Sequence, residues 1–405
     1  MTDTPKSPKI HACSFCGTDK DIVTKLIVGD QAAICSECVE LCSTLISEET
    51  IKANNLKIAK KKTIDAYNIV EHLDKYVVGQ HEAKIVLAVA ITNHYKRIFN
   101  PPPSGLTIDK SNVLLLGPTG CGKTLLAKSV AKYLDVPFIV ADATSLTEAG
   151  YVGDDVESML GALLAKADGD VEKAEHGIIF IDEIDKVARK SENASITRDV
   201  SGEGVQQALL KIVEGTTCRV AENGKRKHPQ EPLIEINTKN ILFIAGGAFG
   251  GLGDIIKSRT TGSSLGFGSE LKEIGDAHFS NVSPDDLMKF GIIPEFIGRF
   301  SSIICVDQLS KDELAKVLTS VKNNFISQYT YLFSIDDIEL SFTEDAIEEI
   351  VLNCIKLKTG ARGLQTEVEH TLLPHMYNIS KYKKKGIKQI NIDKELVLNP
   401  KKLIK

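Results

Sequence analysis

The chain has 405 residues, of which 42% are hydrophobic and 25% are charged, a composition typical of a globular protein with two or three domains. Its formal net charge of −5 excludes a global polycation and argues against nucleic acid as a partner. Apolar runs such as residues 113–116 are far shorter than the roughly 20 residues that cross a bilayer, which argues against a membrane partner. Residues 1–10 show neither a secretory nor a transit signal, so the expected location is the cytoplasm.

The first 50 residues are rich in cysteine. Two C-x₂-C pairs stand eighteen residues apart, a spacing typical of zinc sites: Cys13, Cys16, Cys35 and Cys38. Four thiolates fill a tetrahedron and leave no position for water, so we predict a structural zinc module. Cys42 is a spare fifth thiol. The alternative is a set of free cysteines or disulfides, which a reducing compartment disfavours.

The rest of the chain divides by composition. A lysine-rich segment without aromatic residues predicts a flexible linker, and four short apolar runs that alternate with helix-like stretches predict a parallel sheet covered by helices. Later apolar spacing is helical and predicts a smaller, mainly helical domain. The expected order is a zinc module at 1–50, a linker at 51–63, a large α/β domain at 64–309 and a small C-terminal domain at 310–405.

The strand predicted at 113–116 runs directly into a glycine-rich loop and then a helix, the order that a phosphate-binding loop requires. Successive backbone N–H groups of such a loop surround phosphate oxygens, and the start of the helix adds partial positive charge. Lys123 is expected to reach the β- and γ-phosphates, and the Thr124 hydroxyl to bind Mg²⁺. The nucleotide-binding residues are therefore predicted to be Gly117, Pro118, Thr119, Gly120, Cys121, Gly122, Lys123, Thr124 and Leu125.

The strand predicted at 178–181 ends in two adjacent carboxylates. Asp182 suits the Mg²⁺ shell, and Glu183 suits polarising an attacking water molecule. A strand that ends in an acidic turn is common by itself. Together with the glycine loop, it indicates hydrolysis of a nucleoside triphosphate such as ATP.

The remaining expectations for the core are structural. A strand is predicted at 241–245, a partly disordered surface loop at 248–279, and helices at 312–325 and 344–357.

Three further segments, at 76–80, 291–300 and 360–364, together with the two motifs above, resemble the AAA+ ATPases. The resemblance implies that Val77 and Val78 line an adenine pocket. It also implies that Arg299 reaches the γ-phosphate of a neighbouring subunit and that Arg362 senses nucleotide in its own subunit. Gly246, Gly247 and Ala248 stand where many AAA+ proteins place a polar sensor, so no sensor is assigned there.

Other segments resemble the protein-unfolding Clp branch of that family. Residues 150–153 are similar to an axial pore loop, residues 225–228 to a cationic pore entry, and Leu265-Gly266-Phe267 to a tripeptide that docks on a ClpP-type peptidase. The pore residues would be Tyr151, Val152, Arg226, Lys227 and His228. Taken alone, the four residues favour a tyrosine that packs on its own domain, and the cationic cluster could be a solvated turn or a nucleic-acid patch.

The resemblance thus implies an ATPase in a homohexamer that unfolds tagged proteins, some brought by adaptors, and threads them into a separate peptidase. It would need ATP, Mg²⁺ and Zn²⁺, and its catalytic residues would be Lys123, Asp182, Glu183, Arg299 and Arg362. Two alternatives remain open. One is a nucleic-acid remodelling motor that binds phosphates through its zinc module and residues 225–227, and the other is a zinc adaptor with an inactive ATPase domain.

Overall fold

The computed structural model describes residues 12–29, 32–43, 64–147, 154–189, 202–221, 233–262, 279–357 and 359–402. The chain forms two compact units, Met1–Thr63 and Ile64–Lys405. Several predictions lie outside the described residues: the 51–63 linker, the pore residues Tyr151, Val152, Arg226, Lys227 and His228, and the docking residues Leu265, Gly266 and Phe267.

The first unit has very little apolar core. Strands β1 (Leu26–Val28) and β2 (Ala33–Cys35) pair antiparallel, and residues 36–43 are helical. Its buried cluster consists of three of the four predicted zinc ligands, Cys13, Cys35 and Cys38, with only partly buried apolar neighbours. Because so few apolar side chains are buried, the fold of this unit needs another source of stability.

A five-stranded parallel sheet in the order β11-β3-β10-β7-β4 forms the centre of the second unit. The three inner strands are buried almost throughout, as expected for a sheet that is covered on both faces. The bounds are β3 (Val113–Leu116), β4 (Phe138–Asp142), β7 (Ile178–Asp182), β10 (Leu242–Gly247) and β11 (Ser302–Cys305).

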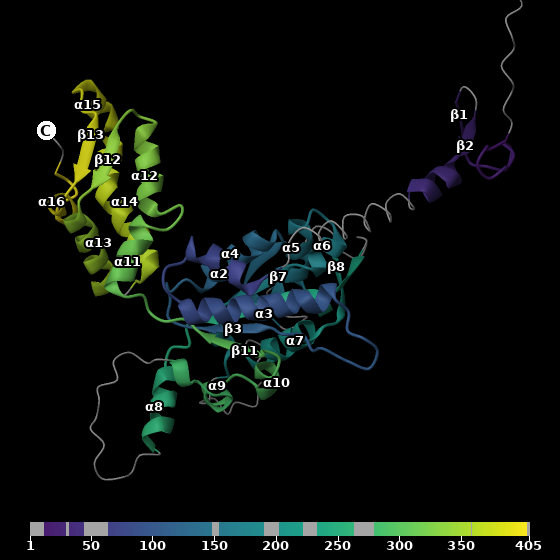
Figure 1. Ribbon diagram of the computed structural model, residues 1–405, viewed down its shortest axis with the longest axis horizontal. Coiled ribbons are helices and arrows are strands. Elements are labelled where there is room, and N and C mark those ends of the chain that lie inside the picture. Colours follow the sequence, from purple (N-terminus) through teal and green to yellow (C-terminus); the bar gives the residue numbers. More distant parts are fainter. Residues whose placement is uncertain are drawn as a thin grey trace, which may run out of the picture. The chain divides into compact units, whose positions relative to one another are not determined.

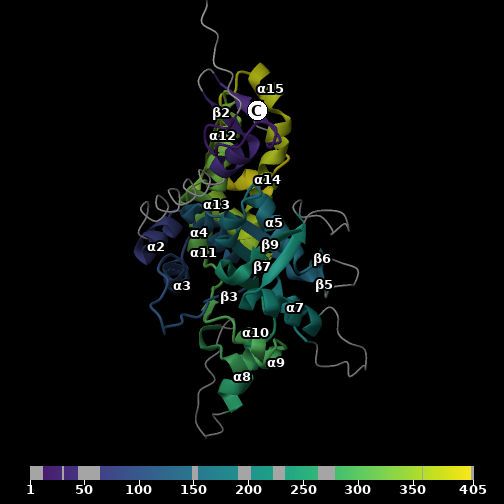
Figure 2. The same ribbon diagram turned by 90° about the vertical axis from the view of Figure 1, so that its right-hand side faces the viewer.

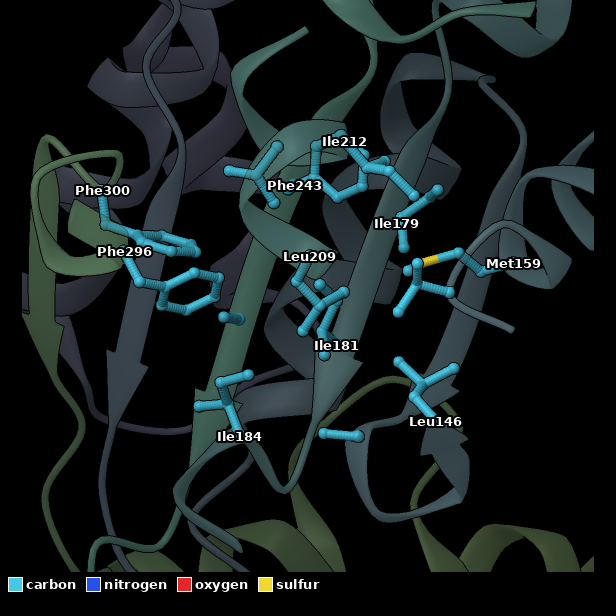
Figure 3. Packing of buried hydrophobic residues seen from close by; sticks show 14 of the residues in the cluster. Leu146, Met159, Ile179, Ile181, Ile184, Leu209, Ile212, Phe243, Phe296 and Phe300 are labelled. Atoms are coloured by element: carbon cyan, nitrogen blue, oxygen red, sulfur yellow. The ribbon is translucent and has the colours of Figure 1, made fainter. Parts of the chain in front are cut away.

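Alternate residues of these strands enter two separate hydrophobic clusters because successive side chains of a strand point to opposite faces. Ile178 and Phe180 pack with α2 (Ala66–Asp74), α3 (His81–Phe99) and α4 (Lys123–Leu134). Ile179, Ile181 and Phe243 pack on the other face with Met159 of α5 (Ser158–Lys166) and Leu209 of α7 (Glu203–Glu214), as Figure 3 shows.

Smaller elements complete the part of the second unit that contains the five-stranded sheet. Two small sheets pair β5 (Leu146–Thr147) with β6 (Asp154–Asp155), and β8 (Thr217–Ala221) with β9 (Leu233–Asn237). Helices α8, α9 and α10 follow one another in space (Figure 2). The remaining bounds are η1 (Ala143–Ser145), α6 (Val171–Glu175), η2 (Ile184–Val187), η3 (Thr238–Asn240), α8 (Leu252–Gly262), η4 (Phe279–Asn281), α9 (Pro284–Phe290) and α10 (Pro294–Ile297).

The C-terminal residues have a hydrophobic cluster of their own. The helices gather around a parallel pair of strands, β12 and β13 (Figure 1). The bounds are α11 (Lys311–Thr319), α12 (Phe325–Ser334), β12 (Glu339–Phe342), α13 (Glu344–Lys356), α14 (Ala361–Tyr377), α15 (Ile379–Lys384), β13 (Gln389–Ile392) and α16 (Lys394–Leu398). Among the described helices, none combines the length and the apolar character that a bilayer crossing requires.

The structure confirms the α/β class, the parallel sheet and the four predicted strands, and it corrects three details. The helix predicted at 312–325 ends at Thr319, and α12 starts anew because the Asn324 side chain accepts a hydrogen bond from Ser327 N. The predicted loop at 248–279 contains α8, which buries Leu252 and Ile256. Strand β10 continues through Gly247, so Gly246 and Gly247 lie within the strand.

Candidate active site

The glycine loop lies between β3 and α4, as predicted. Gly120 and Gly122 have φ angles of 82° and 100°, a left-handed conformation that glycine adopts without steric cost. Gly117 N donates to Gly247 O over 3.3 Å, which ties the start of the loop to the neighbouring strand β10. The backbone therefore makes the tight turn that brings successive N–H groups to the start of α4.

Lys123 points into this loop. Its side-chain Nζ donates to Gly117 O over 2.6 Å and to Pro118 O over 2.9 Å, and the residue is only 8% exposed. A buried ammonium that is held by neutral carbonyls strongly attracts an anion, because burial weakens screening by water. The loop and the lysine together suit phosphate.

Two oxygen ligands of the predicted magnesium site meet at the end of β7. Thr124 Oγ1, in the first turn of α4, donates to Asp182 Oδ2 over 3.3 Å. A hydroxyl and a carboxylate at this distance, beside a phosphate loop, fit the preference of Mg²⁺ for a few protein oxygens plus phosphate. Glu183 follows with a left-handed φ of 56°, and its N–H donates to Asp182 Oδ1 over 2.9 Å. Its exposed carboxylate is thereby presented beside the same site.

The structure around Gly247 explains why no polar side chain stands at the sensor position. A Cβ on Gly247 would lie 2.6 Å from Asp185 Oδ1, and the same oxygen accepts a hydrogen bond from Ala248 N over 3.1 Å. The buried carboxylate of Asp185 thus occupies the space beside β10. Sequence reasoning missed Asp185, although a third acid so close to Asp182 and Glu183 is a signal that could have found it.

The C-terminal residues contact the glycine loop directly. Ala361 N donates to Gly120 O over 3.3 Å, and a Cβ on Gly120 would lie 2.9 Å from Thr359 O. Arg362 is therefore next to a residue that touches the loop, and its side chain is exposed at the start of α14. This placement suits a cation that responds to nucleotide in the same chain.

Arg299 lies elsewhere. Its carbonyl accepts a hydrogen bond from Asn112 Nδ2 over 3.0 Å, just before β3, whereas the glycine loop follows the end of β3. Its side chain is half exposed and pairs with Glu214. The structure therefore does not bring Arg299 to the glycine loop of its own chain.

A cavity of about 360 Å³ opens beside the predicted adenine residues. Val77 and Val78 line one side, and Lys316, Ser320 and Val321 line the other. Its other lining residues are Asp74, Gly79, His81 and Lys84, so no residue of the glycine loop belongs to it. The structure thus places Val77 and Val78 next to the C-terminal residues but does not join this cavity to the phosphate loop.

The four predicted zinc ligands converge. The sulfur atoms of Cys13, Cys16, Cys35 and Cys38 all lie within 4.8 Å of one another. Cys16 Sγ and Cys35 Sγ are 3.7 Å apart, close to the roughly 3.8 Å that a tetrahedral site with Zn–S bonds near 2.3 Å gives. Cys42 is not a member of this group.

The electrostatics of this cluster favour a cation. Backbone hydrogen bonds, first from Cys16, lower the pKa of Cys13 to about 6, whereas the hydrogen bond with Cys35 and burial raise the pKa of Cys38. Several thiolates cannot ionise side by side unless a positive charge compensates them. The cysteines therefore fit a zinc ion, which supplies that charge.

The sheet order, the glycine loop after β3 and the Thr124–Asp182 pair define a P-loop ATPase of the AAA+ class. Residues 108–303 match the AAA domain (Cdc48 subfamily), residues 11–48 match the ClpX C4-type zinc finger, and residues 309–388 match the C-terminal, D2-small domain, of ClpB protein.

Two relatives that match over nearly their whole length identify the family. The chain is 49% identical over 395 residues to the ATP-dependent Clp protease ATP-binding subunit ClpX of Treponema denticola, covering 96% of this chain and 94% of the relative. It is 50% identical over 399 residues to the protein of the same description from Borrelia duttonii, covering 97% and 92%. The chain belongs to the ClpX family.

Proposed function

We propose that this chain is an ATP-driven protein unfoldase that selects tagged proteins and threads them through a ring of six copies into a ClpP-type peptidase. The observation that carries the proposal is the buried Lys123 ammonium beside the Thr124–Asp182 pair, inside a chain that matches ATP-binding subunits of the Clp protease over nearly its whole length. Hydrolysis of ATP requires this machinery, and the relatives' description names them as subunits of an ATP-dependent Clp protease.

Each residue of the nucleotide site has its own role in ATP hydrolysis. Lys123 and the loop N–H groups bind the phosphates, and Thr124 and Asp182 hold Mg²⁺, which neutralises charge on the β- and γ-phosphate oxygens when bound. Glu183 accepts a hydrogen bond from the attacking water and thereby raises the nucleophilicity of the water oxygen. Arg362 stabilises phosphate charge in the same chain, and Arg299 does so from a neighbouring copy. Val77 and Val78 contact the adenine.

The mechanical residues belong to the same proposal. Tyr151 and Val152 grip the polypeptide, while Arg226, Lys227 and His228 attract its carboxylate-bearing end. Leu265, Gly266 and Phe267 dock on the peptidase. The family resemblance supports these roles.

The proposal also covers organisation and location. Residues 1–50 form the zinc module, 51–63 link it to the ATPase domain at 64–309, and 310–405 form the small domain. The separate hydrophobic cluster of the C-terminal helices supports the last boundary. The cytoplasm is the proposed compartment, since its reducing conditions keep four thiolates available for zinc.

Degradation of a tagged folded protein tests the function. The wild-type chain with a ClpP-type peptidase and ATP is expected to degrade it, and omission of either ATP or the peptidase is expected to stop degradation. Glu183→Gln removes the carboxylate beside the water and should slow ATP hydrolysis by roughly a hundredfold to ten-thousandfold while ATP still binds.

The matched control is Glu339→Gln, an exposed residue of β12 far from the glycine loop in sequence, which should behave as wild type. Wild-type protein that hydrolyses ATP only when DNA is added, and never degrades the tagged protein, would contradict the proposal and favour a nucleic-acid motor.

A further inference from the structure

Gln80 makes an unusual pair of contacts. Its side-chain Nε2 donates to Asp307 O over 2.7 Å, and Asp307 N donates back to Gln80 Oε1 over 3.0 Å. The amide thereby binds both backbone groups of one residue that lies 227 positions away. Glutamine suits this role because its side chain has a donor and an acceptor on the same amide.

The two partners lie in connections of different kinds. Gln80 ends the connection between α2 and α3 that carries Val77 and Val78, whereas Asp307 lies in the connection from β11 to α11, where the C-terminal residues begin. The two hydrogen bonds of Gln80 therefore fix one against the other.

The backbone on the Gln80 side is committed to this arrangement. Gly79 and Gln80 both have left-handed φ angles, 64° and 57°, and Gln80 is not a glycine. Such a conformation persists where the surroundings hold it. A Cβ on Gly79 would overlap Glu313 Oε1, and Glu313 caps α11 by accepting a hydrogen bond from Ser310 N over 2.8 Å. The glycine thus lets the segment approach α11 without displacing the Glu313 side chain.

The preceding residues are anchored as well. The fully buried Lys84 side chain donates to Val77 O and to Asp74 Oδ1, each over 2.7 Å. Lys322 N, beyond α11, donates to Lys75 O over 2.8 Å. The whole of residues 74–80 is therefore a fixed surface against which the C-terminal residues pack.

On the other side, Asp307 leads to the phosphate loop. Its neighbour Val306 donates through N to Leu116 O over 2.7 Å, and a Cβ on Gly117 would overlap Val306 O. Residues 306–307 thus touch the first residue of the glycine loop and Gln80 at once. Gln80 is the side chain that joins the adenine segment to this junction.

We propose that Gln80 is a positioning residue that sets the orientation of the C-terminal residues over the nucleotide site by holding the main chain of Asp307. This inference rests on the proposed ATPase function. In this arrangement the side chain acts through Asp307 and Val306, whereas Val77 and Val78 contact the base.

The test uses the full chain and compares Gln80→Met, which removes both hydrogen bonds at similar size, with Gln80→Glu, which keeps only the acceptor. Gln328→Met is the matched control, because the Gln328 amide also bonds a backbone carbonyl, that of Asn323, but within the C-terminal residues. Equilibrium binding of the fluorescent nucleotide mant-ATP with Mg²⁺, steady-state ATPase kinetics and hydrogen exchange at residues 306–309 are the measurements.

We expect Gln80→Met to weaken mant-ATP binding about fivefold or more, the usual size of a coupling between sites, and to affect the KM for ATP more than kcat. Exchange at 306–309 should accelerate because the Asp307 amide loses its acceptor, while exchange in α4 stays unchanged. Gln80→Glu should accelerate exchange less, and Gln328→Met should match wild type. If Gln80→Met does not fold, the mant-ATP affinity of Gln80→Glu and its hydrogen exchange at residues 306–309 decide.

Unchanged binding and unchanged exchange in a Gln80 variant, with a wild type that binds mant-ATP, would overturn this inference alone. A general fall in kcat and thermal stability without a change in KM would also overturn it, since that is the result of a merely structural role. A wild-type chain that binds no nucleotide would instead overturn the proposed function itself.

Discussion

A buried histidine and a half-buried lysine lie at the end of the sheet where β10 begins, away from the glycine loop. Lys110 Nζ donates to Thr238 O over 2.9 Å, and burial lowers its pKa to about 6. His94 Nε2 lies 3.0 Å from Asn240 O, and burial, with the nearby charge of Arg97, lowers the pKa of His94 to about 3. Burial disfavours the protonated form of both side chains, and the charge of Arg97 adds to this effect.

The pKa of His94 predicts how stability depends on pH. In the folded chain the imidazole stays neutral down to about pH 3, whereas in the unfolded chain it takes a proton below its ordinary value of 6.5. The unfolded state therefore binds more protons between these values, and stability falls as pH falls. His94→Gln should remove this contribution, so urea unfolding should show a slope shallower than wild type by about 1 kcal/mol per pH unit below pH 6.5. Equal slopes for both proteins would contradict the assignment.

At the level of secondary structure, the features that local sequence encodes were predictable. The glycine loop, the acidic end of β7 and the cysteine pairs each occupy one short stretch, so their residue types and spacing suffice. Strand β11 was missed because its four residues gain their identity only from pairing with β3, almost 200 residues earlier along the chain. The same holds for Asp185 and Gln80, whose partners at Ala248 and Asp307 are brought close by the fold alone.

The zinc module shows how far an element depends on its metal. Its strands are three residues each, and its buried core consists of cysteines. Metal binding therefore supplies the free energy of folding that burial cannot.

Cys13→Ser should lower the bound zinc well below about one ion per chain and should accelerate hydrogen exchange across residues 12–43, because three ligands hold the ion less tightly. The unit Ile64–Lys405 has its own clusters and should melt unchanged. Cys42→Ser is the control. The Cys42 thiol lies outside the ligand group, so this variant should retain its zinc. Elemental analysis of the two purified variants decides, and full zinc in Cys13→Ser would remove the site.

At the scale of the whole molecule, the position of Arg299 bears on the proposed ring of copies. The residue lies by the start of β3, and the glycine loop lies past its end. If Arg299 acts on nucleotide as proposed, it must reach the site of another copy, and we therefore expect hydrolysis to depend on assembly.

Mixing two inactive variants tests this dependence. Arg299→Ala and Glu183→Gln should each lose at least about a hundredfold in ATPase rate when pure. In mixed rings, a Glu183→Gln subunit still offers its arginine to an Arg299→Ala neighbour whose own glutamate is intact, so part of the activity should return. A mixture of Glu183→Gln with Lys123→Ala should stay inactive. Each of these subunits lacks a group that is needed at its own nucleotide site and that a neighbour cannot supply. Co-assembled rings without recovery would show that Arg299 does not act between subunits.

The contact between Gly120 and residues 359–361 has a mechanical consequence. Helix α14 starts at this contact and has 17 residues, which corresponds to a rod about 25 Å long. A tilt of about 10° at the end that touches the loop would displace the far end by roughly 4 Å. Because Leu364, Val368 and Leu372 of α14 belong to the C-terminal cluster, we expect a shift of the glycine loop to move that whole cluster with the helix.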